Sequence, residues 1–180
     1  MKIKMEDSNR TIEHFVNLLS KVSRQDYIKT FENFDFKSID FECYESWCHD
    51  QYTRNCIYKN QEFELLLICW DRHQETSVHN HDGEDCWVHV LKGEIEEIFY
   101  NFDEKGHLRK IKSHIASEAS TSFINDKIAL HKLKNNFDGK TMSLHLYAKP
   151  IEKCRSYCED SGHFEERVLE YDSQNGVNEN

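Results

Sequence analysis

Residues 63–70 read Phe-Glu-Leu-Leu-Leu-Ile-Cys-Trp, and nearly all of them are apolar, at odd-numbered and even-numbered positions alike. Because neighbouring side chains of a strand point to opposite faces, this run predicts a strand that is buried on both faces. The short segments after it have no helical run between them and are separated by turn signals at Asp82-Gly83, Lys92-Gly93, Asp103–Gly106 and Asn135–Gly139. From about Phe63 the chain therefore predicts a mainly β fold, either an antiparallel sandwich or a small barrel.

Helical spacing precedes this β region. Five apolar residues of the segment 8–33 fall on one helical stripe: Ile12, Phe15, Val16, Leu19 and Val22. Ser8 or Thr11 could cap the first turn. We expect two short helices in an N-terminal part of about residues 8–40, followed by a β part of about residues 45–172.

The end of the chain carries one further strand candidate, Arg-Val-Leu-Glu-Tyr at residues 167–171. Residues 173–180 form a polar run rich in Asn and Gln, and we expect this tail to fray. A length of 180 residues without a low-complexity linker predicts a single domain over residues 1–180.

Composition limits the classes of partner. The formal net charge is −10 at pH 7 and no basic stripe occurs, which excludes nucleic acid as a partner. No apolar window is long enough for a membrane span, and the N-terminus has no signal-peptide pattern. The seven cysteines are an odd number and are not arranged in the paired spacing of a zinc site, so we expect free thiols. We also expect a cytoplasmic protein, and a monomer. Cys154 and Cys158 could form half of a metal site, but no second half is visible.

Residues 77–86, Ser-Val-His-Asn-His-Asp-Gly-Glu-Asp-Cys, hold two histidines two positions apart. On a strand, His79 and His81 present their imidazoles to one face and can chelate a metal ion. Two surface histidines on an exposed strand explain an isolated pair of this kind equally well. A third ligand has to come from elsewhere in the chain.

His131 is the candidate third ligand. It lies among apolar neighbours in Phe-Ile-Asn-Asp-Lys-Ile-Ala-Leu-His-Lys-Leu-Lys-Asn, residues 123–135. A lone histidine in such a place is more often a buried residue with a satisfied hydrogen bond. Its position, two or three predicted strands after His81, favours a ligand because an antiparallel barrel could return it to the pair.

Residues 141–150, Thr-Met-Ser-Leu-His-Leu-Tyr-Ala-Lys-Pro, alternate polar and apolar side chains. Thr141, Ser143, His145 and Tyr147 share one face of the predicted strand. This face either meets water on an edge strand or lines a cavity, with serine, histidine and tyrosine in a hydrogen-bonded relay. The sequence leaves both possibilities open.

The set of donor atoms bears on the chemistry. Two histidines and a carboxylate are the usual ligands of non-haem iron oxygenases. Here the position five residues after His81 holds Cys86. If His131 completes the set, three neutral imidazoles leave the metal its full positive charge, which favours an anionic ligand such as a substrate thiolate.

Four motifs in order resemble the cysteine dioxygenase family, the mononuclear iron thiol dioxygenases of the cupin superfamily. They are YTRN at 52–55 with LLLICW at 65–70, SVHNH…C…LKGEI at 77–95, FINDKIALHKLKN at 123–135 and SLHLYAKP at 143–150. The match covers roughly residues 45–165, and the first 40 residues are similar only in helical character. The resemblance implies a small cupin-type, jelly-roll-like antiparallel β-barrel with short N-terminal helices.

The resemblance also implies roles for the cavity residues. Its metal would be one Fe(II), bound by His79, His81 and His131. Arg54 would hold the substrate carboxylate, and Tyr52 would lie beside it.

Further roles follow from the same resemblance. Cys154 would lie at the mouth of the cavity. Tyr147 would stand near the iron with His145 and Ser143 behind it. Cys86 could be joined to Tyr147 by a thioether crosslink.

The implied reaction adds both atoms of O2 to the sulfur of L-cysteine and gives cysteine sulfinate, in cysteine catabolism towards taurine or towards sulfite and pyruvate. Two alternatives stay open: a dioxygenase for another small thiol, 3-mercaptopropionate or cysteamine, and a cupin that binds metal without turnover. Arg54 bears on the first, because cysteamine has no carboxylate to hold. The chain departs from the family pattern at Asp82, Glu84 and Asp85, which are either solvated loop charges or groups that slow the entry of anionic substrates.

Overall fold

The structure, a computed structural model, describes residues 11–178. Two helices come first, α1 (Ile12–Leu19) and α2 (Tyr27–Asn33). One short 3-10 turn, Arg24–Asp26, lies between them, and two more follow α2, Phe36–Ser38 and Glu42–Tyr44. The strands are β1 (Thr53–Lys59), β2 (Glu64–Trp70), β3 (Cys86–Lys92), β4 (Glu94–Phe102), β5 (Leu108–Ser117), β6 (Thr121–Ile124), β7 (Leu130–Lys134), β8 (Thr141–Tyr147), β9 (Lys153–Cys158), β10 (His163–Val168), β11 (Ser173–Gln174) and β12 (Val177–Asn178). Within the described chain, no helix is long and apolar enough to cross a membrane.

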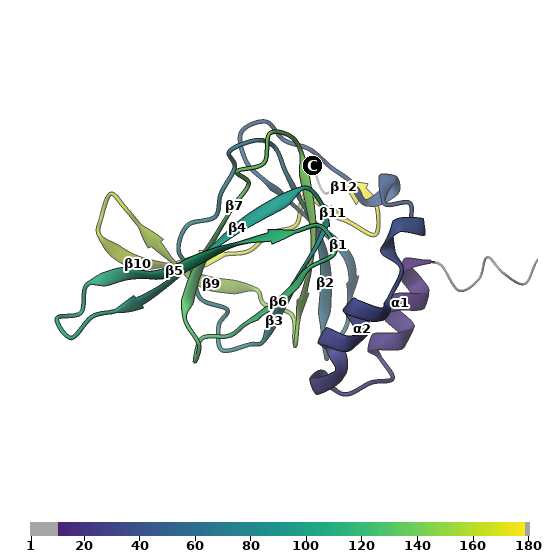
Figure 1. The fold of residues 1–180 in the computed structure, drawn as a ribbon, viewed down its shortest axis with the longest axis horizontal. Coiled ribbons are helices and arrows are strands. Elements are labelled where there is room, and N and C mark those ends of the chain that lie inside the picture. Colours follow the sequence, from purple (N-terminus) through teal and green to yellow (C-terminus); the bar gives the residue numbers. More distant parts are fainter. Residues whose placement is uncertain (1–10, 179–180) are drawn as a thin grey trace, which may run out of the picture.

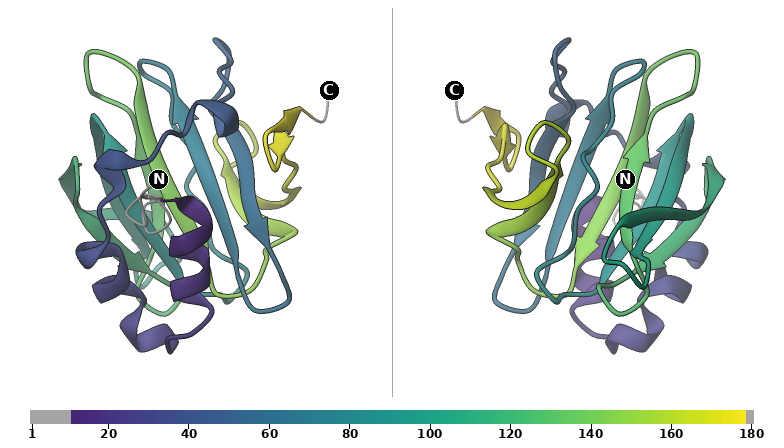
Figure 2. Two further views of the ribbon diagram at one scale, coloured as in Figure 1. Left: turned by 90° about the vertical axis from the view of Figure 1, so that its right-hand side faces the viewer. Right: turned by 90° about the vertical axis from the view of Figure 1, so that its left-hand side faces the viewer.

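The strands form two layers. One layer is a seven-stranded sheet of order β12-β11-β1-β2-β8-β3-β6. The other contains the sheets β5-β4-β7 and β10-β9, which the segment 75–79 joins through isolated bridges to Lys134, His131 and Ser156. Figure 1 shows the helices on one side of the seven-stranded sheet and β4, β5, β7, β9 and β10 on the other, and Figure 2 shows the same arrangement from both sides. The mainly β, jelly-roll-like fold is confirmed, although strand pairing among residues 11–178 does not close into a continuous barrel.

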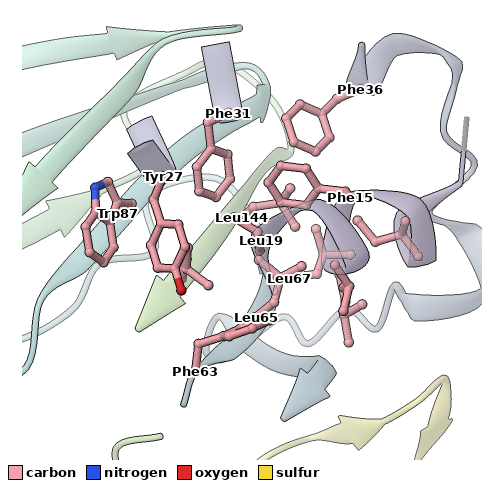
Figure 3. Packing of buried hydrophobic residues seen from close by; sticks show 14 of the residues in the cluster. Phe15, Leu19, Tyr27, Phe31, Phe36, Phe63, Leu65, Leu67, Trp87 and Leu144 are labelled. Carbon is pink, nitrogen blue, oxygen red and sulfur yellow. The ribbon is translucent and has the colours of Figure 1, made fainter. Parts of the chain in front are cut away.

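The helices cover the outer face of the large sheet. Thr11 caps α1 by accepting a hydrogen bond from the His14 amide at 3.2 Å, whereas Ser8 lies outside the described residues. Four residues of the predicted apolar stripe are buried in α1, whereas Val22 lies beyond its end and is partly buried. Phe15 packs its ring 4.9 Å from that of Phe31. Figure 3 shows these rings gathered above Leu67 of β2. Burying a side chain of this size stabilises the fold by about 1.5–3 kcal/mol, so the helices fix the outer face and leave the inner face to the second layer.

The run of residues 63–70 forms the central strand β2, as predicted, between β1 and β8. Every residue of β2 is buried. Strand β1 begins at Thr53, inside the expected β part of residues 45–172 but ahead of Phe63, where the strand pattern of the sequence begins. The polar sequence of β1 does not indicate a buried strand. Its Asn55 can be buried because it accepts hydrogen bonds from the hydroxyls of Ser46 and Ser173, at 2.6 and 2.8 Å.

The end of the chain is more ordered than a frayed tail. Strand β11 pairs in parallel with β1 at Asn55 and Cys56, and β12 folds back on β11. The Tyr171 hydroxyl donates to the buried Glu64 carboxylate at 2.5 Å. Residues 179–180 lie outside the described part. The strand candidate at 167–171 contributes only its first two residues to a strand, since β10 ends at Val168.

Candidate metal centre and cavity

Three histidines converge between the two layers. Their ligand atoms all lie within 4.8 Å of one another. His79 and His81 lie on an extended segment before β3, and His131 lies in β7. The backbones of His79 and His131 exchange two hydrogen bonds, of 2.9 and 3.2 Å. Four strands, β3 to β6, separate His81 from His131 in the chain, so the expected distance of two or three strands was too short.

The Nδ1 atoms of these histidines face acceptors. His131 Nδ1 lies 2.8 Å from Glu97 Oε1, and His79 Nδ1 lies 2.9 Å from the Ser77 carbonyl oxygen. Carboxylates and carbonyls only accept, so both Nδ1 atoms carry the proton and both Nε2 atoms present a lone pair. His81 Nδ1 makes a longer contact of 3.5 Å with Asp126 Oδ1.

This arrangement fits a metal ion. The Nε2 atoms of His81 and His131 lie 3.0 Å apart. Because His131 Nδ1 donates to Glu97, the Nε2 lone pair of His131 points toward His81. A cation between the two rings would accept a lone pair from each Nε2 atom, with the His81 proton on Nδ1 toward Asp126. Three neutral imidazoles with carboxylate or carbonyl partners at Nδ1 are a usual environment for a transition metal in proteins.

Burial keeps the imidazole of His81 neutral. It lowers the pKa of His81 to about 4, despite the opposing effect of Asp126. Burial and the neighbouring imidazoles likewise hold the pKa of His79 well below its ordinary value. Because only neutral imidazole binds a metal, the group is ready to bind one at neutral pH.

The carboxylates behind the ligands were not predicted. Burial disfavours the charged form of Glu97, but the hydrogen bonds from His131 and Ser122 and the attraction of His131 and His114 together outweigh burial and lower the pKa of the carboxyl group. Glu97 is only 1% exposed and shares the inward parity of Ile95 and Phe99 in β4. The sequence signal that could have indicated Glu97 is a glutamate at an inward-facing, otherwise apolar position of a strand. Asp126 accepts from the amides of His81 and Gly83, at 2.7 and 2.8 Å, which fixes the turn after the ligand pair.

Glu97→Gln is expected to weaken metal binding by about tenfold to a hundredfold, because partners of this kind orient the ligand and raise its basicity. Metal retained during dialysis against a graded chelator series measures the effect. Glu96→Gln, next in the chain but directed toward Asn136 at the surface, is the matched control. Equal metal retention in the two variants would show that the Glu97 charge does not support the centre.

The polar face of β8 lies inside the protein. Strand β8 is central, between β2 and β3, so the edge-strand alternative is wrong. Ser143 Oγ lies 3.0 Å from His145 Nε2 and accepts a hydrogen bond of 2.9 Å from Trp70 Nε1, a partner not predicted from the sequence. His145 and Tyr147 rings lie 6.3 Å apart at their centroids, with no hydrogen bond between these two residues. The relay therefore runs from Trp70 to His145, and Tyr147 stands beside it.

Cys86 and Tyr147 face each other across β3 and β8, where they are register partners. Cys86 is fully buried and Tyr147 is 7% exposed. Burial raises the pKa of both groups well above their ordinary values, so both are protonated at neutral pH. Side chains directly opposite in an antiparallel pair lie close enough to react with each other.

A cavity adjoins the histidines. Its lining includes His79 and His145, the predicted substrate residues Tyr52, Arg54 and Cys154, and Tyr147. Arg54 stands out in this lining, because its Nε and Nη2 atoms are buried and have no hydrogen-bond partner among the described residues. The guanidinium lies 5.9 Å from the Tyr171 ring. The predicted substrate residues are thus brought together beside His79, His145 and Tyr147, whereas the other predicted site residues do not line this cavity: His81, His131, Ser143 and Cys86.

The three acidic residues after His81 are directed into local contacts. Asp85 accepts from the Asn125 side chain at 2.9 Å, and Glu84 lies 3.9 Å from Lys149. Asp82 has a left-handed backbone, with φ of 53°, at the turn. None of the three lines the cavity beside Arg54.

Comparisons with known proteins agree with this geometry. The family model described as cysteine dioxygenase type I matches residues 4–160. Cysteine dioxygenase type 1 of Bos taurus is 25% identical over 178 residues, covering 93% of this chain and 89% of the relative. The protein of that name from Danio rerio is 25% identical over 164 residues, covering 85% and 82% of the two chains.

Among solved structures, an uncharacterized conserved protein with a double-stranded β-helix domain from Klebsiella pneumoniae superposes with a TM-score of 0.53. It is 12% identical, and the match covers 72% of this chain and 88% of that one, so it supports the fold alone. The match of the family model over most of the sequence carries the assignment: this chain belongs to the cysteine dioxygenase type I family.

Proposed function

We propose that this protein is a non-haem Fe(II) thiol dioxygenase that adds both atoms of O2 to the sulfur of L-cysteine and gives cysteine sulfinate. The observation that carries the proposal is the unpartnered guanidinium of Arg54, in a cavity that also reaches His79. A buried donor without a partner is costly, and a carboxylate is the partner that fits its planar fork. A carboxylate held beside the three histidines suits a small thiol acid.

The residues of this chain would position the substrate. His79, His81 and His131 would hold the iron, which when bound would supply the redox chemistry that lets a thiol react with dioxygen. Arg54 would hold the substrate carboxylate, with Tyr52 beside it. Holding the thiol and dioxygen in one geometry would turn a bimolecular reaction into an effectively unimolecular one and so lower its entropic barrier. The overall change, RSH + O2 → RSO2H, needs no further reductant.

Tyr147 and His145 would order the reacting end of the cavity. The raised pKa of Tyr147 keeps its hydroxyl protonated, so it can donate a hydrogen bond to the sulfur or oxygen of the reacting group. Burial lowers the pKa of His145 well below its ordinary value, so this ring stays neutral beside the guanidinium of Arg54. Ser143, at 3.0 Å, would fix the orientation of His145, and both residues are buried.

The proposed reaction places the protein in cysteine catabolism in the cytoplasm, upstream of taurine or of sulfite and pyruvate. A passive metal-binding cupin would not require an anchored carboxylate or the ordered side chains of β8. Cysteamine is a poor fit because it offers Arg54 no carboxylate.

The test is oxygen uptake by the Fe(II)-loaded protein with L-cysteine, 3-mercaptopropionate and cysteamine in parallel, with mass analysis of the products. We expect uptake with L-cysteine and a product that has gained two oxygen atoms. Greater uptake with 3-mercaptopropionate would move the assignment to that thiol. If the iron-loaded protein consumes no oxygen with any of the three thiols, the dioxygenase proposal fails and the remaining function is that of a cupin that binds metal without turnover.

Cys86→Ser is expected to abolish a thioether to Tyr147 and to leave measurable turnover, because Cys86 is not a metal ligand. Forming the crosslink removes the thiol hydrogen and one ring hydrogen, a two-electron oxidation for which dioxygen is the oxidant. After turnover, we expect the wild type to show a faster band on a denaturing gel and a mass lower by two hydrogen atoms. Cys154→Ser, a cavity residue that is not paired with Tyr147, is the control. A wild-type chain that runs as a single unshifted band and has the full mass expected from its sequence would count against the crosslink.

A further inference from the structure

A second arginine faces the cavity from its mouth. The hairpin of β9 and β10 contributes to the wall of the cavity, which Cys154 and Ser156 of β9 line. Arg167 of β10 is the register partner of Cys154. Residues directly opposite in an antiparallel pair lie on the same face, so Arg167 points to the same side as the cavity residues. It lines both the inner cavity and the wider depression outside it.

Arg167 is free to bind an anion. Within residues 11–178 it forms no ion pair with a carboxylate, and the acidic groups next to it in β10 are engaged elsewhere. Glu166 pairs with Lys153 at 2.8 Å, and Glu165 accepts from Ser161 at 2.8 Å. Arg72, which lines the same outer depression, is instead paired with Asp138 at 2.9 Å.

The positive charge of Arg167 acts inside the cavity. Burial raises the pKa of Tyr52, and Arg167 opposes this rise more strongly than any other charge, Arg54 included. The outer depression also carries acidic residues, among them Glu75 and Glu170, and the chain has a formal net charge of −10. Arg167 lies between these acidic residues and the inner cavity. Its positive charge raises the local concentration of anions, although the net negative charge of the protein repels them.

Two arginines at different depths distinguish ligands by their number of anionic groups. We propose that Arg167 is a specificity-determining residue that binds a second carboxylate of the ligand, while Arg54 binds the first. Besides thiols with one carboxylate, such as L-cysteine, the cavity then also takes thiols that bear two, with the first carboxylate at Arg54 and the second at Arg167. This inference rests on the proposed function for the role of Arg54. Mercaptosuccinate is a small probe of this class, and 3-mercaptopropionate is the matched thiol with one carboxylate.

The experiment measures binding without turnover. Fe(II)-loaded protein is titrated calorimetrically with each thiol in the absence of oxygen, for the wild type, Arg167→Gln and Arg155→Gln. Arg155 lies on the same hairpin but contacts Phe164 outside the cavity, with its guanidinium 5.9 Å from that ring. We expect the wild type to bind mercaptosuccinate more tightly than 3-mercaptopropionate.

Arg167→Gln is expected to weaken mercaptosuccinate binding by about tenfold, the effect of one charge-assisted hydrogen bond, and to change 3-mercaptopropionate binding by less than about twofold. Arg155→Gln should change neither affinity. Arg167→Lys keeps the charge without the fork and should recover part of the affinity.

Three results would overturn the inference: wild type that does not prefer mercaptosuccinate, no loss in Arg167→Gln, or equal losses for both thiols. The readout separates this inference from the proposed function. If no thiol is oxidised in air but the selective loss occurs, the second anion site stands and the dioxygenase assignment fails. If L-cysteine is oxidised and Arg167→Gln binds both thiols like the wild type, the inference alone fails.

Discussion

Replacing His131 with alanine is expected to remove the bound metal and to lower thiol oxidation to the uncatalysed level. The substitution deletes one of three ligands, so the loss of metal affinity should exceed the about hundredfold upper range found for partners behind a ligand. It also leaves Glu97, 1% exposed, without its donor at 2.8 Å. A buried charge that loses its partner costs about 3–5 kcal/mol, so the free energy of unfolding should fall as well.

Metal content and oxygen uptake measure the first effect, and denaturant unfolding measures the second. His114→Ala is the matched control, because His114 approaches the other oxygen of Glu97, at 3.5 Å, from the exposed side. This control should keep its metal and its activity. A His131→Ala protein with one tightly bound metal and unchanged turnover would mean that His131 is not a ligand.

Arg54→Met is expected to raise the KM for L-cysteine by about a hundredfold or more, since hydrogen bonds to charged groups contribute about 1.5–3 kcal/mol each and the fork makes two. Metal should be retained, because the guanidinium contacts none of the three histidines through a hydrogen bond. The free protein should become more stable, since Nε and Nη2 are buried without partners and methionine is apolar and of similar length. Loss of activity with a gain in Tm is the pattern expected of a binding group held unsatisfied for its ligand.

Steady-state kinetics, metal analysis and thermal unfolding test the three parts separately. Arg54→Lys is the informative second variant, because it keeps the charge but cannot pair with two oxygens of a carboxylate. We expect its KM to lie between those of the wild type and Arg54→Met. Loss of the metal in Arg54→Met would show that this residue supports the metal centre instead of the substrate.

Local patterns in the sequence determined much of this protein. The stripe of α1, the buried run of β2 and the alternation of β8 follow from side-chain periodicity, which depends only on residues near one another in the chain. The pair His79 and His81 and the arginine at position 54 could be singled out because their chemistry is recognisable at short spacing and because the motifs resemble one family. These features gave the fold class and the candidate ligands.

Only the tertiary structure decided which face of β8 is enclosed and what lies behind the ligands. Strand β8 is central because β2 and β3 pair on either side of it, a long-range choice that its own alternation does not contain. Glu97 reaches His131 across the pairing of β4 with β7, and Arg167 reaches the cavity through its register with Cys154. Strand register sets each of these meetings, and a shift of one residue would turn every one of these side chains to the opposite face.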